Sequence, residues 1–317
     1  MKRSDTRVSV VIVAYRSADV LEDCLRSVPA DAEVIVVDQS SPDDTVAAVA
    51  RSGRAVRLIA AGANRGFGAG CNIGAANATG DTLIFLNPDA RLTGDAAAIL
   101  AAAAQGFPGG VVGPRMLDDA GHDVTHARRR SSCRTDVLDL LVPVGVQPVR
   151  WRREPQWDSE IYRRGGRVLY VQGACMAIDR ELFWRCGGFD ERLFIYGEEE
   201  YLAARVREAG REALIEPAAV VRHIGSTSID RVRPYAIEQL YRSRVLTYRR
   251  SASAPGTVAR TLALGTTVLA LWLTTPARKA VGYRAVLDRT WGRAAMRGLW
   301  RGLRGRPAVA PDPGETR

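Results

Sequence analysis

The first third of the chain alternates between short apolar runs and segments with helical spacing. Apolar, β-branched runs of strand length cover residues 8–14, 33–37, 56–60 and 82–86. Residues 18–28 and 69–78 have the spacing of helices with one apolar face. Because a strand, a helix and a second strand within about 30 residues form a βαβ unit, the pattern predicts an α/β fold with a mostly parallel, mixed sheet. Ligands of such sheets bind at the carboxyl ends of the strands.

The same domain is expected to continue to residue 250. Further elements are predicted at residues 95–105, 109–114, 168–178, 180–186 and 198–209. Between them, residues 118–167 are rich in arginine and poorly periodic, so we expect a long excursion over the ligand site. Residues 1–250 are therefore predicted to form one α/β domain, which also carries the candidate catalytic residues described below.

A C-terminal helical, membrane-associated region is predicted at residues 251–306. Residues 261–277 carry no charge and would span about 25 Å as a helix, slightly less than a hydrocarbon core of about 30 Å. They are either a marginal membrane segment or a buried helix of a small subdomain. Residues 282–306 place leucine and tryptophan among arginines, which is typical of a basic amphipathic helix. Residues 307–317 are expected to be a disordered tail.

The net charge and the spacing of the cysteines indicate the cellular compartment of the protein. The net charge is +10, and much of the excess lies beyond Arg222, so an anionic partner is expected. The partner is a phosphate, a lipid headgroup or nucleic acid. Nucleic acid is disfavoured because no nucleic-acid module is present and the C-terminal arginines alternate with tryptophan and leucine, a pattern that favours an anionic membrane surface. The cysteines lack CxxC spacing. We therefore expect a cytoplasmic protein at the inner face of the plasma membrane.

Two acidic residues end buried strands. Asp38 follows the run 33–37, where its carboxylate either accepts a hydrogen bond from a pyrimidine base or closes an Asx turn or caps a helix. Asp89 ends the sequence Asn87-Pro88-Asp89 and can bind a hard divalent ion that bridges phosphate oxygens. The alternative for this second site is a proline turn.

Residues 64–72 form a glycine-rich entry to a helix. Asn64, Arg65 and Gly66 begin the segment, and its glycines allow a ligand to approach the backbone closely. A helix N-terminus favours phosphate, and Arg65 can add a cation. The alternative is a tight loop in which glycine is needed for close packing.

Glu198 and Glu199 lie in a run of three glutamates that opens a helix. The helix dipole favours acidic residues there, but adjacent carboxylates below an aromatic stretch can also supply a general base with a raised pKa. His223 follows an apolar run and is either a hydrogen-bonded structural residue or a metal ligand.

Taken in order, these motifs resemble the family 2 glycosyltransferases, most closely their rhamnosyltransferase-like branch. The similar segments are residues 36–38, 64–72, 86–89, 173–175, 187–191 and 196–199, followed by His223. The resemblance covers about residues 7–250 and implies a GT-A fold that binds a nucleotide sugar. It also implies that Tyr15 and Asp38 hold the base of the donor, together with residues 64–66 and Asn87 around its phosphates.

The resemblance assigns the remaining roles. Asp89 and His223 would hold a divalent metal, Mn²⁺ or Mg²⁺, and Glu199 or Glu198 would deprotonate the acceptor. Two departures from the family pattern are Asn87, where an aspartate is usual, and the Glu198-Glu199 pair, where Glu-Asp is usual.

The expected function is inverting transfer of a sugar, rhamnose first, from a dTDP or UDP sugar. The acceptor would be a polyprenyl-diphosphate-linked glycan or cell-wall precursor. The rival interpretations are a nucleotidyltransferase and a catalytically silent nucleotide- or glycan-binding relative.

Overall fold

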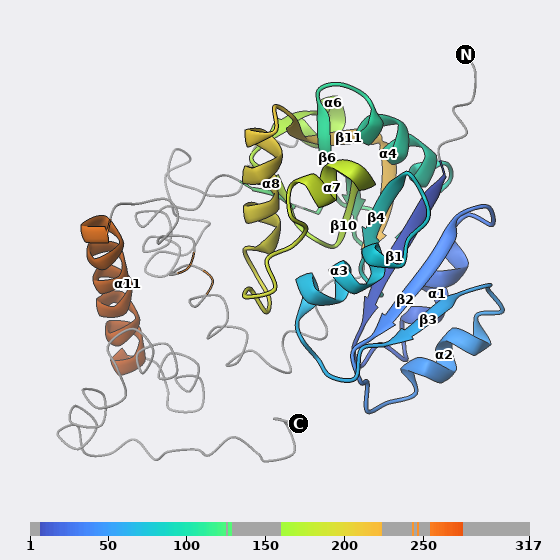
Figure 1. The fold of residues 1–317 in the computed structure, drawn as a ribbon, viewed down its shortest axis with the longest axis horizontal. Coiled ribbons are helices and arrows are strands. Elements are labelled where there is room, and N and C mark those ends of the chain that lie inside the picture. Colours follow the sequence, from blue (N-terminus) through green and yellow to red (C-terminus); the bar gives the residue numbers. More distant parts are fainter. Residues whose placement is uncertain are drawn as a thin grey trace. The chain divides into compact units, whose positions relative to one another are not determined.

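A nine-stranded mixed sheet forms the core of the unit that comprises the described residues up to 223 (Figure 1). The computed structural model describes residues 7–124, 126–128, 160–223, 243, 246 and 254–274. In spatial order, the sheet consists of β3 (Arg57–Ala60), β2 (Glu33–Asp38), β1 (Val8–Ala14), β4 (Thr82–Leu86), β10 (Cys175–Asp179), β6 (Gly109–Leu117), β11 (Glu212–His223) and β5 (Ala90–Leu92), with β8 (Gly166–Val168) paired to β11. A separate pair consists of β7 (Ala127–Arg128) and β9 (Tyr170–Val171).

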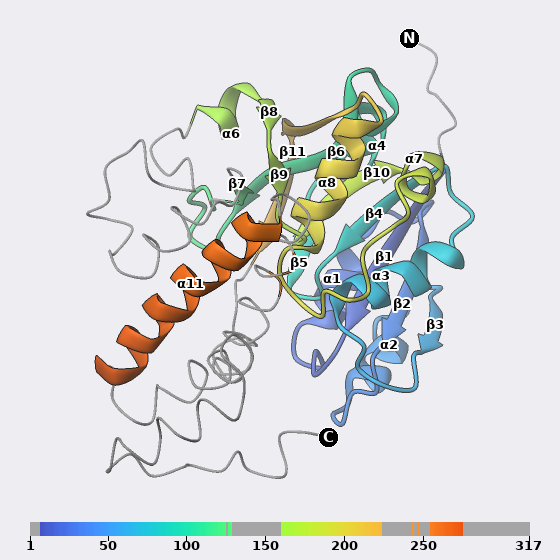
Figure 2. The same cartoon turned by 60° about the vertical axis from the view of Figure 1, so that its left-hand side comes forward.

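The strands that carry the predicted site are parallel. β1 pairs in parallel with both β2 and β4, and β2 pairs in parallel with β3. Figure 2 shows these four strands side by side. β10 runs antiparallel between β4 and β6, and β5 runs antiparallel to β11. The predicted α/β class with a mixed sheet is confirmed, but parallel and antiparallel pairs are equally frequent in it, because β5, β8 and β10 run against their neighbours.

Helices cover both faces of the sheet because its strands are apolar on both sides. α1 (Leu21–Ser27), α2 (Thr45–Arg51) and α4 (Ala96–Gln105) contribute to one core, and α3 (Phe67–Ala76), α7 (Arg180–Arg185) and α8 (Glu198–Glu208) contribute to the other. β1 supplies both, since Val10 and Ile12 face the first core while Val11 and Val13 face the second. A short helix, α6 (Ile161–Arg164), precedes β8.

Most predicted elements are present, but the short elements β5, β7 and α6 were not predicted. The pattern did not predict α2, whose buried side chains are limited to Thr45, Ala48 and Val49. The predicted strand at 168–178 is divided into the end of β8, β9 and β10. It breaks because residues 172–174 turn toward the carboxyl end of β4, where Asn87 N–H donates to Ala174 O at 2.9 Å.

The described part of the C-terminal region is a single helix, α11 (Ala254–Thr274). Among the described helices, none combines the length and apolar character that crossing a membrane requires. The boundary at residue 250, the amphipathic segment 282–306, the tail 307–317 and most of the excursion at 118–167 lie outside the described residues.

α3 lies unusually close to β1 because its inner face is made of glycines. A Cβ atom built on Gly70 would lie 2.6 Å from Val13 Cγ1, and one built on Gly74 would lie 2.2 Å from Val11 Cγ1. These positions are one helical turn apart, so they share a face. Glycine therefore sets the distance between helix and sheet here.

This packing predicts that Gly74→Ala destabilises the protein. Alanine is favoured over glycine within a helix by about 0.5–1 kcal/mol, but the clash with Val11 should outweigh this gain by about 1–3 kcal/mol. In a Val11→Ala background the penalty should disappear, which a double-mutant cycle of urea unfolding measures. Stabilisation by Gly74→Ala in the wild-type background would show that α3 has room to move.

Candidate functional site

The predicted donor-binding residues meet at one edge of the sheet. β1 and β2 pair in register with Ala14 opposite Asp38, and β4 ends beside β1 with Leu86 opposite Ile12. Tyr15 and Asn87 directly follow the ends of β1 and β4. Side chains from three separate parts of the sequence therefore lie at the carboxyl ends of adjacent parallel strands, where α/β sheets bind ligands.

Asp38 is only 6% exposed and closes a tight turn at the end of β2. Ser41 N–H lies 3.3 Å from each of its carboxylate oxygens. Asp38 therefore closes a local turn with its side chain, but to the residue three positions on and not two as in an Asx turn. A carboxylate has about four acceptor positions, so this turn leaves capacity for a ligand and holds the group in place for it.

Asp89 and His223 lie next to each other. β11 pairs antiparallel with β5, with His223 opposite Ala90, and this register places Asp89 Oδ1 at 3.3 Å from His223 Nε2. Both side chains are mostly buried, at 15% and 16% exposed.

This spacing suits one divalent ion. Two ligands at right angles, each about 2.1 Å from a metal, lie about 3 Å apart. One carboxylate and one imidazole fit Mn²⁺ or Mg²⁺ that takes its other ligands from phosphate and water. Within the described residues no cluster of three or more metal-binding side chains exists, so Asp89 and His223 would depend on the donor to complete the coordination.

The glycines of the loop before α3 serve packing. Gly66 has φ 94°, and a Cβ atom there would lie 2.2 Å from Phe194 O. Phe67 N–H, at the start of α3, donates to the same carbonyl at 2.9 Å. Of the two sequence interpretations, close packing is therefore the one observed, and phosphate binding by residues 64–66 stays a prediction.

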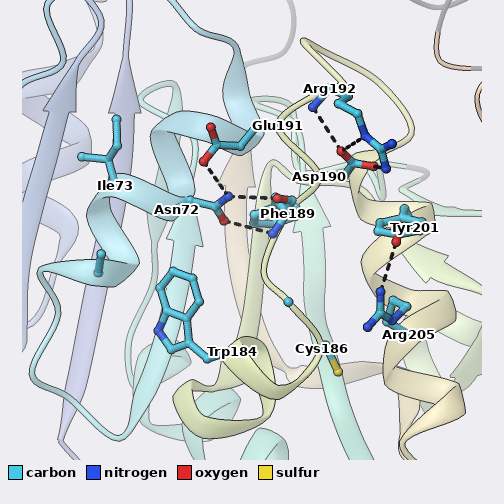
Figure 3. A pocket seen from close by; sticks show the side chains of 12 residues that line it. Asn72, Ile73, Trp184, Cys186, Phe189, Asp190, Glu191, Arg192, Tyr201 and Arg205 are labelled. Atoms are coloured by element: carbon cyan, nitrogen blue, oxygen red, sulfur yellow. Dashed lines mark hydrogen bonds and ion pairs between the residues drawn. The ribbon is translucent and has the colours of Figure 1, made fainter.

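The polar side chains of this loop are held by neighbours. Asn64 Oδ1 accepts from Gly66 N–H at 3.1 Å, and the Arg65 guanidinium pairs with Glu191 at 2.8 Å. Glu191 also accepts from Asn72 Nδ2 at 3.2 Å, and Asn72 binds the backbone of Phe189 through both ends of its amide (Figure 3). The loop before α3 is thus joined to the segment that leads into α8.

Glu198 and Glu199 point to different surroundings. Glu198 is 2% exposed, and its Oε2 has no hydrogen-bond partner within the described chain. Glu199 Oε1 accepts from Gly173 N–H at 2.9 Å. Burial raises the pKa of both carboxyls, and repulsion from Glu199 raises the pKa of Glu198 further. The hydrogen bond from Gly173 opposes the rise in the pKa of Glu199 and fixes the position of its carboxylate.

Backbone strain marks the same site. In the described chain, left-handed φ values at non-glycine residues occur at Arg16 (52°), Ser40 (59°) and Tyr196 (69°). Each lies within two residues of a predicted site residue. Such conformations cost about 1–3 kcal/mol and concentrate at functional sites. Three independent segments therefore carry strain where the sequence places the chemistry.

Two contributors were missed in the sequence. Gln39 is 3% exposed and bonds to the loop before α3, and Glu191 holds Arg65. The available signals were a polar residue directly after a strand-end aspartate and an acidic residue within the 187–191 motif. Neither signal identifies a partner, because both partners lie far away in the sequence.

Comparisons with known proteins identify the family of this chain. A family model for glycosyl transferase family 2 matches residues 9–187. An N-acetylglucosaminyl-diphospho-decaprenol L-rhamnosyltransferase of Mycobacterium tuberculosis is 31% identical over 237 residues, which cover 68% of this chain and 75% of that protein. The low-salt glycan biosynthesis hexosyltransferase Agl10 of Haloferax volcanii is 25% identical over 239 residues, covering 74% of this chain and 72% of the relative.

The fold also resembles that of solved glycosyltransferases. The mannosyltransferase PcManGT from Pyrobaculum calidifontis, solved in complex with GDP-Man and Mn²⁺, has a TM-score of 0.54 at 19% identity, covering 94% of this chain and 88% of that one. At this identity the likeness concerns the fold alone. Together with the family match over more than half of the sequence, it supports a GT-A-like architecture, and the chain belongs to glycosyl transferase family 2.

Proposed function

We propose that this glycosyltransferase transfers a sugar, with rhamnose the first candidate, from a dTDP or UDP sugar to a polyprenyl-diphosphate-linked glycan. The name of the Mycobacterium tuberculosis relative supports both rhamnose and a lipid-diphosphate acceptor. The GDP-Man and Mn²⁺ bound by the Pyrobaculum calidifontis enzyme support a nucleotide-sugar donor and a divalent ion. Family membership favours glycosyl transfer over the rival nucleotidyl transfer.

One observation carries the proposal: two consecutive residues connect the candidate metal motif with the candidate base. Ala174 O accepts from Asn87 N–H at 2.9 Å, at the start of the motif that ends in Asp89. Gly173 N–H donates to Glu199 Oε1 at 2.9 Å. A carboxylate with a raised pKa is thereby fixed beside the place where a diphosphate would bind.

Glu199 acts as the general base in this proposal. Its carboxylate accepts the proton of the acceptor hydroxyl as the hydroxyl oxygen bonds to the anomeric carbon. The bond from that carbon to the diphosphate breaks on the opposite face, so the configuration inverts. Glu198 is buried beside Gly68 of α3, its Oε2 has no hydrogen-bond partner within the described chain, and burial and the Glu199 charge raise its pKa, so it is given no part in the proton transfer.

The other residues bind and orient the donor. Tyr15 and Asp38 hold the base of the nucleotide at the ends of β1 and β2. Asp89 and His223 would hold Mn²⁺ or Mg²⁺, which when bound neutralises the charge of the departing diphosphate. When the donor binds, the Arg65 guanidinium leaves Glu191 and pairs with a phosphate oxygen, since a guanidinium binds both carboxylates and phosphates well.

We further propose that the protein works at the inner face of the plasma membrane. The acceptor class requires access to a lipid-linked substrate. The basic segment 282–306 supplies charge that anionic lipids attract. α11, which contains most of the uncharged segment 261–277, precedes it in the sequence.

Glu199→Gln is expected to lower kcat by roughly 10²- to 10⁴-fold, the usual contribution of a general base, with little change in donor affinity. Since burial raises the pKa of Glu199 above its ordinary 4.5, wild-type activity should fall as the pH drops through that raised value. Steady-state kinetics across pH measure both effects. Glu198→Gln is the control and should retain most activity, because glutamine mimics a protonated acid; greater damage by this control would reassign the base.

Asp89→Asn and His223→Ala should each weaken Mn²⁺ binding in the presence of nucleoside diphosphate by about tenfold or more. Electron paramagnetic resonance titration of Mn²⁺ measures this independently of turnover. His122→Ala is a matched control, because His122 Nδ1 lies 3.4 Å from Asp118 at an exposed position. Equal metal affinity in all three variants would remove the metal role from this pair.

The membrane proposal predicts salt-sensitive binding of the full-length protein to phosphatidylglycerol vesicles. Replacing Arg297, Arg301 and Arg304 by glutamine should weaken binding by about 100-fold, since each basic residue contributes about 1 kcal/mol near an anionic surface. Vesicle co-sedimentation gives the affinities, with phosphatidylcholine vesicles as the control. Unchanged binding after the triple substitution, or none by the wild type, would refute surface attraction through this segment.

A further inference from the structure

Gln39 connects the end of β2 with the loop before α3 through its side-chain amide. Its Nε2 donates to Gly66 O at 3.1 Å, and its Oε1 accepts from Arg65 N–H at 2.9 Å. The side chain is 3% exposed. Both the donor and the acceptor of the Gln39 amide therefore bond to the Arg65–Gly66 dipeptide. This dipeptide begins 26 residues further along the chain.

The chemistry of this contact requires a primary amide of this length. A backbone N–H can only donate and a carbonyl can only accept, so the partner must offer one acceptor and one donor. A carboxylate lacks the donor and an aliphatic side chain lacks both. Buried hydrogen bonds of this kind are costly to leave unmade, so the Arg65–Gly66 dipeptide is held in one position relative to β2.

Gln39 also holds the end of β1. Its backbone N–H donates to Ala14 O at 2.9 Å, directly before Tyr15. In the sequence, Gln39 lies between Asp38 and Ser40, and Ser40 has a strained φ of 59°. One residue thus contacts or adjoins all three segments that the proposed function assigns to the two halves of the donor.

We propose that Gln39 is a positioning residue that fixes the diphosphate-binding loop, residues 64–66, relative to the base-binding pair Tyr15 and Asp38. A nucleoside diphosphate touches both sides of this connection, whereas a nucleoside touches only the base side. This inference rests on the proposed donor class and adds the residue that sets the spacing of the two half-sites.

The structure offers a matched control for a merely structural amide. Gln105 Nε2, at the end of α4, donates to Asp81 O at 3.2 Å, Thr82 Oγ1 at 3.0 Å and Asp179 Oδ2 at 2.9 Å. These partners lie at the start of β4 and the end of β10, at the opposite end of the sheet from the site. Removing the Gln105 amide shows how far a loss of folding stability, without any change at the site, affects ligand binding.

The experiment uses the full-length protein with Mn²⁺ and compares the dissociation constants of a nucleoside diphosphate, dTDP or UDP, and of its parent nucleoside by calorimetry. Gln39→Met has similar volume and lacks both hydrogen bonds. It should weaken diphosphate binding about 10- to 100-fold, the scale expected for displaced binding groups, while nucleoside affinity changes less than about threefold. Gln105→Met should lower the melting temperature and leave both constants unchanged.

The possible outcomes separate this inference from the proposed function. If the wild type binds neither dTDP nor UDP, the proposed donor class fails. If the wild type binds one of them and Gln39→Met binds it equally well, or loses nucleoside and diphosphate in equal measure, the positioning role is overturned while the donor class stands. Gln39→Glu, which keeps the acceptor for Arg65 N–H, should weaken diphosphate binding and spare the nucleoside even if the methionine variant does not fold.

Discussion

The two backbone hydrogen bonds of Gly173 and Ala174 are the constraint on which the site depends. β10 enters antiparallel between β4 and β6, with Cys175 opposite Leu86. The residues before β10 must therefore lie over the end of β4. From there Ala174 accepts from the Asn87 backbone and Gly173 donates to Glu199. The antiparallel strand thus brings a helix from late in the chain to a parallel βαβ unit from its beginning.

Much of the donor side of the site could be predicted from sequence pattern. Apolar runs ending in polar residues identify β1, β2 and β4, and parallel strands place Tyr15, Asp38 and Asp89 at one edge without any knowledge of distant contacts. His223 is different. Its place beside Asp89 depends on the antiparallel pairing of β5, a strand of three residues that no periodicity indicates. The sequence marks His223 as a possible metal ligand, but only the resemblance to the family paired it with Asp89.

The connections within the site could not be predicted because they join side chains to distant backbone. Gln39 reaches a loop 26 residues away, and the ion pair between Arg65 and Glu191 spans 126 residues. The sequence could not distinguish the two roles of the glycines, ligand approach and close packing, for a related reason. Close approach to a ligand and close approach to Val11 or Phe194 require the same missing Cβ, and only the packed structure distinguishes them.

Glycosyl transfer at this sheet edge has a chemical signature that a single measurement records. Phosphorus NMR of the wild-type protein with dTDP-rhamnose, Mn²⁺ and a polyprenyl-diphosphate-linked N-acetylglucosamine should show acceptor-dependent release of free dTDP. Proton NMR of the glycosylated acceptor should show an anomeric configuration opposite to that of the sugar in the donor. Release of pyrophosphate, or retention of the anomeric configuration, would contradict inverting glycosyl transfer with Glu199 as the base.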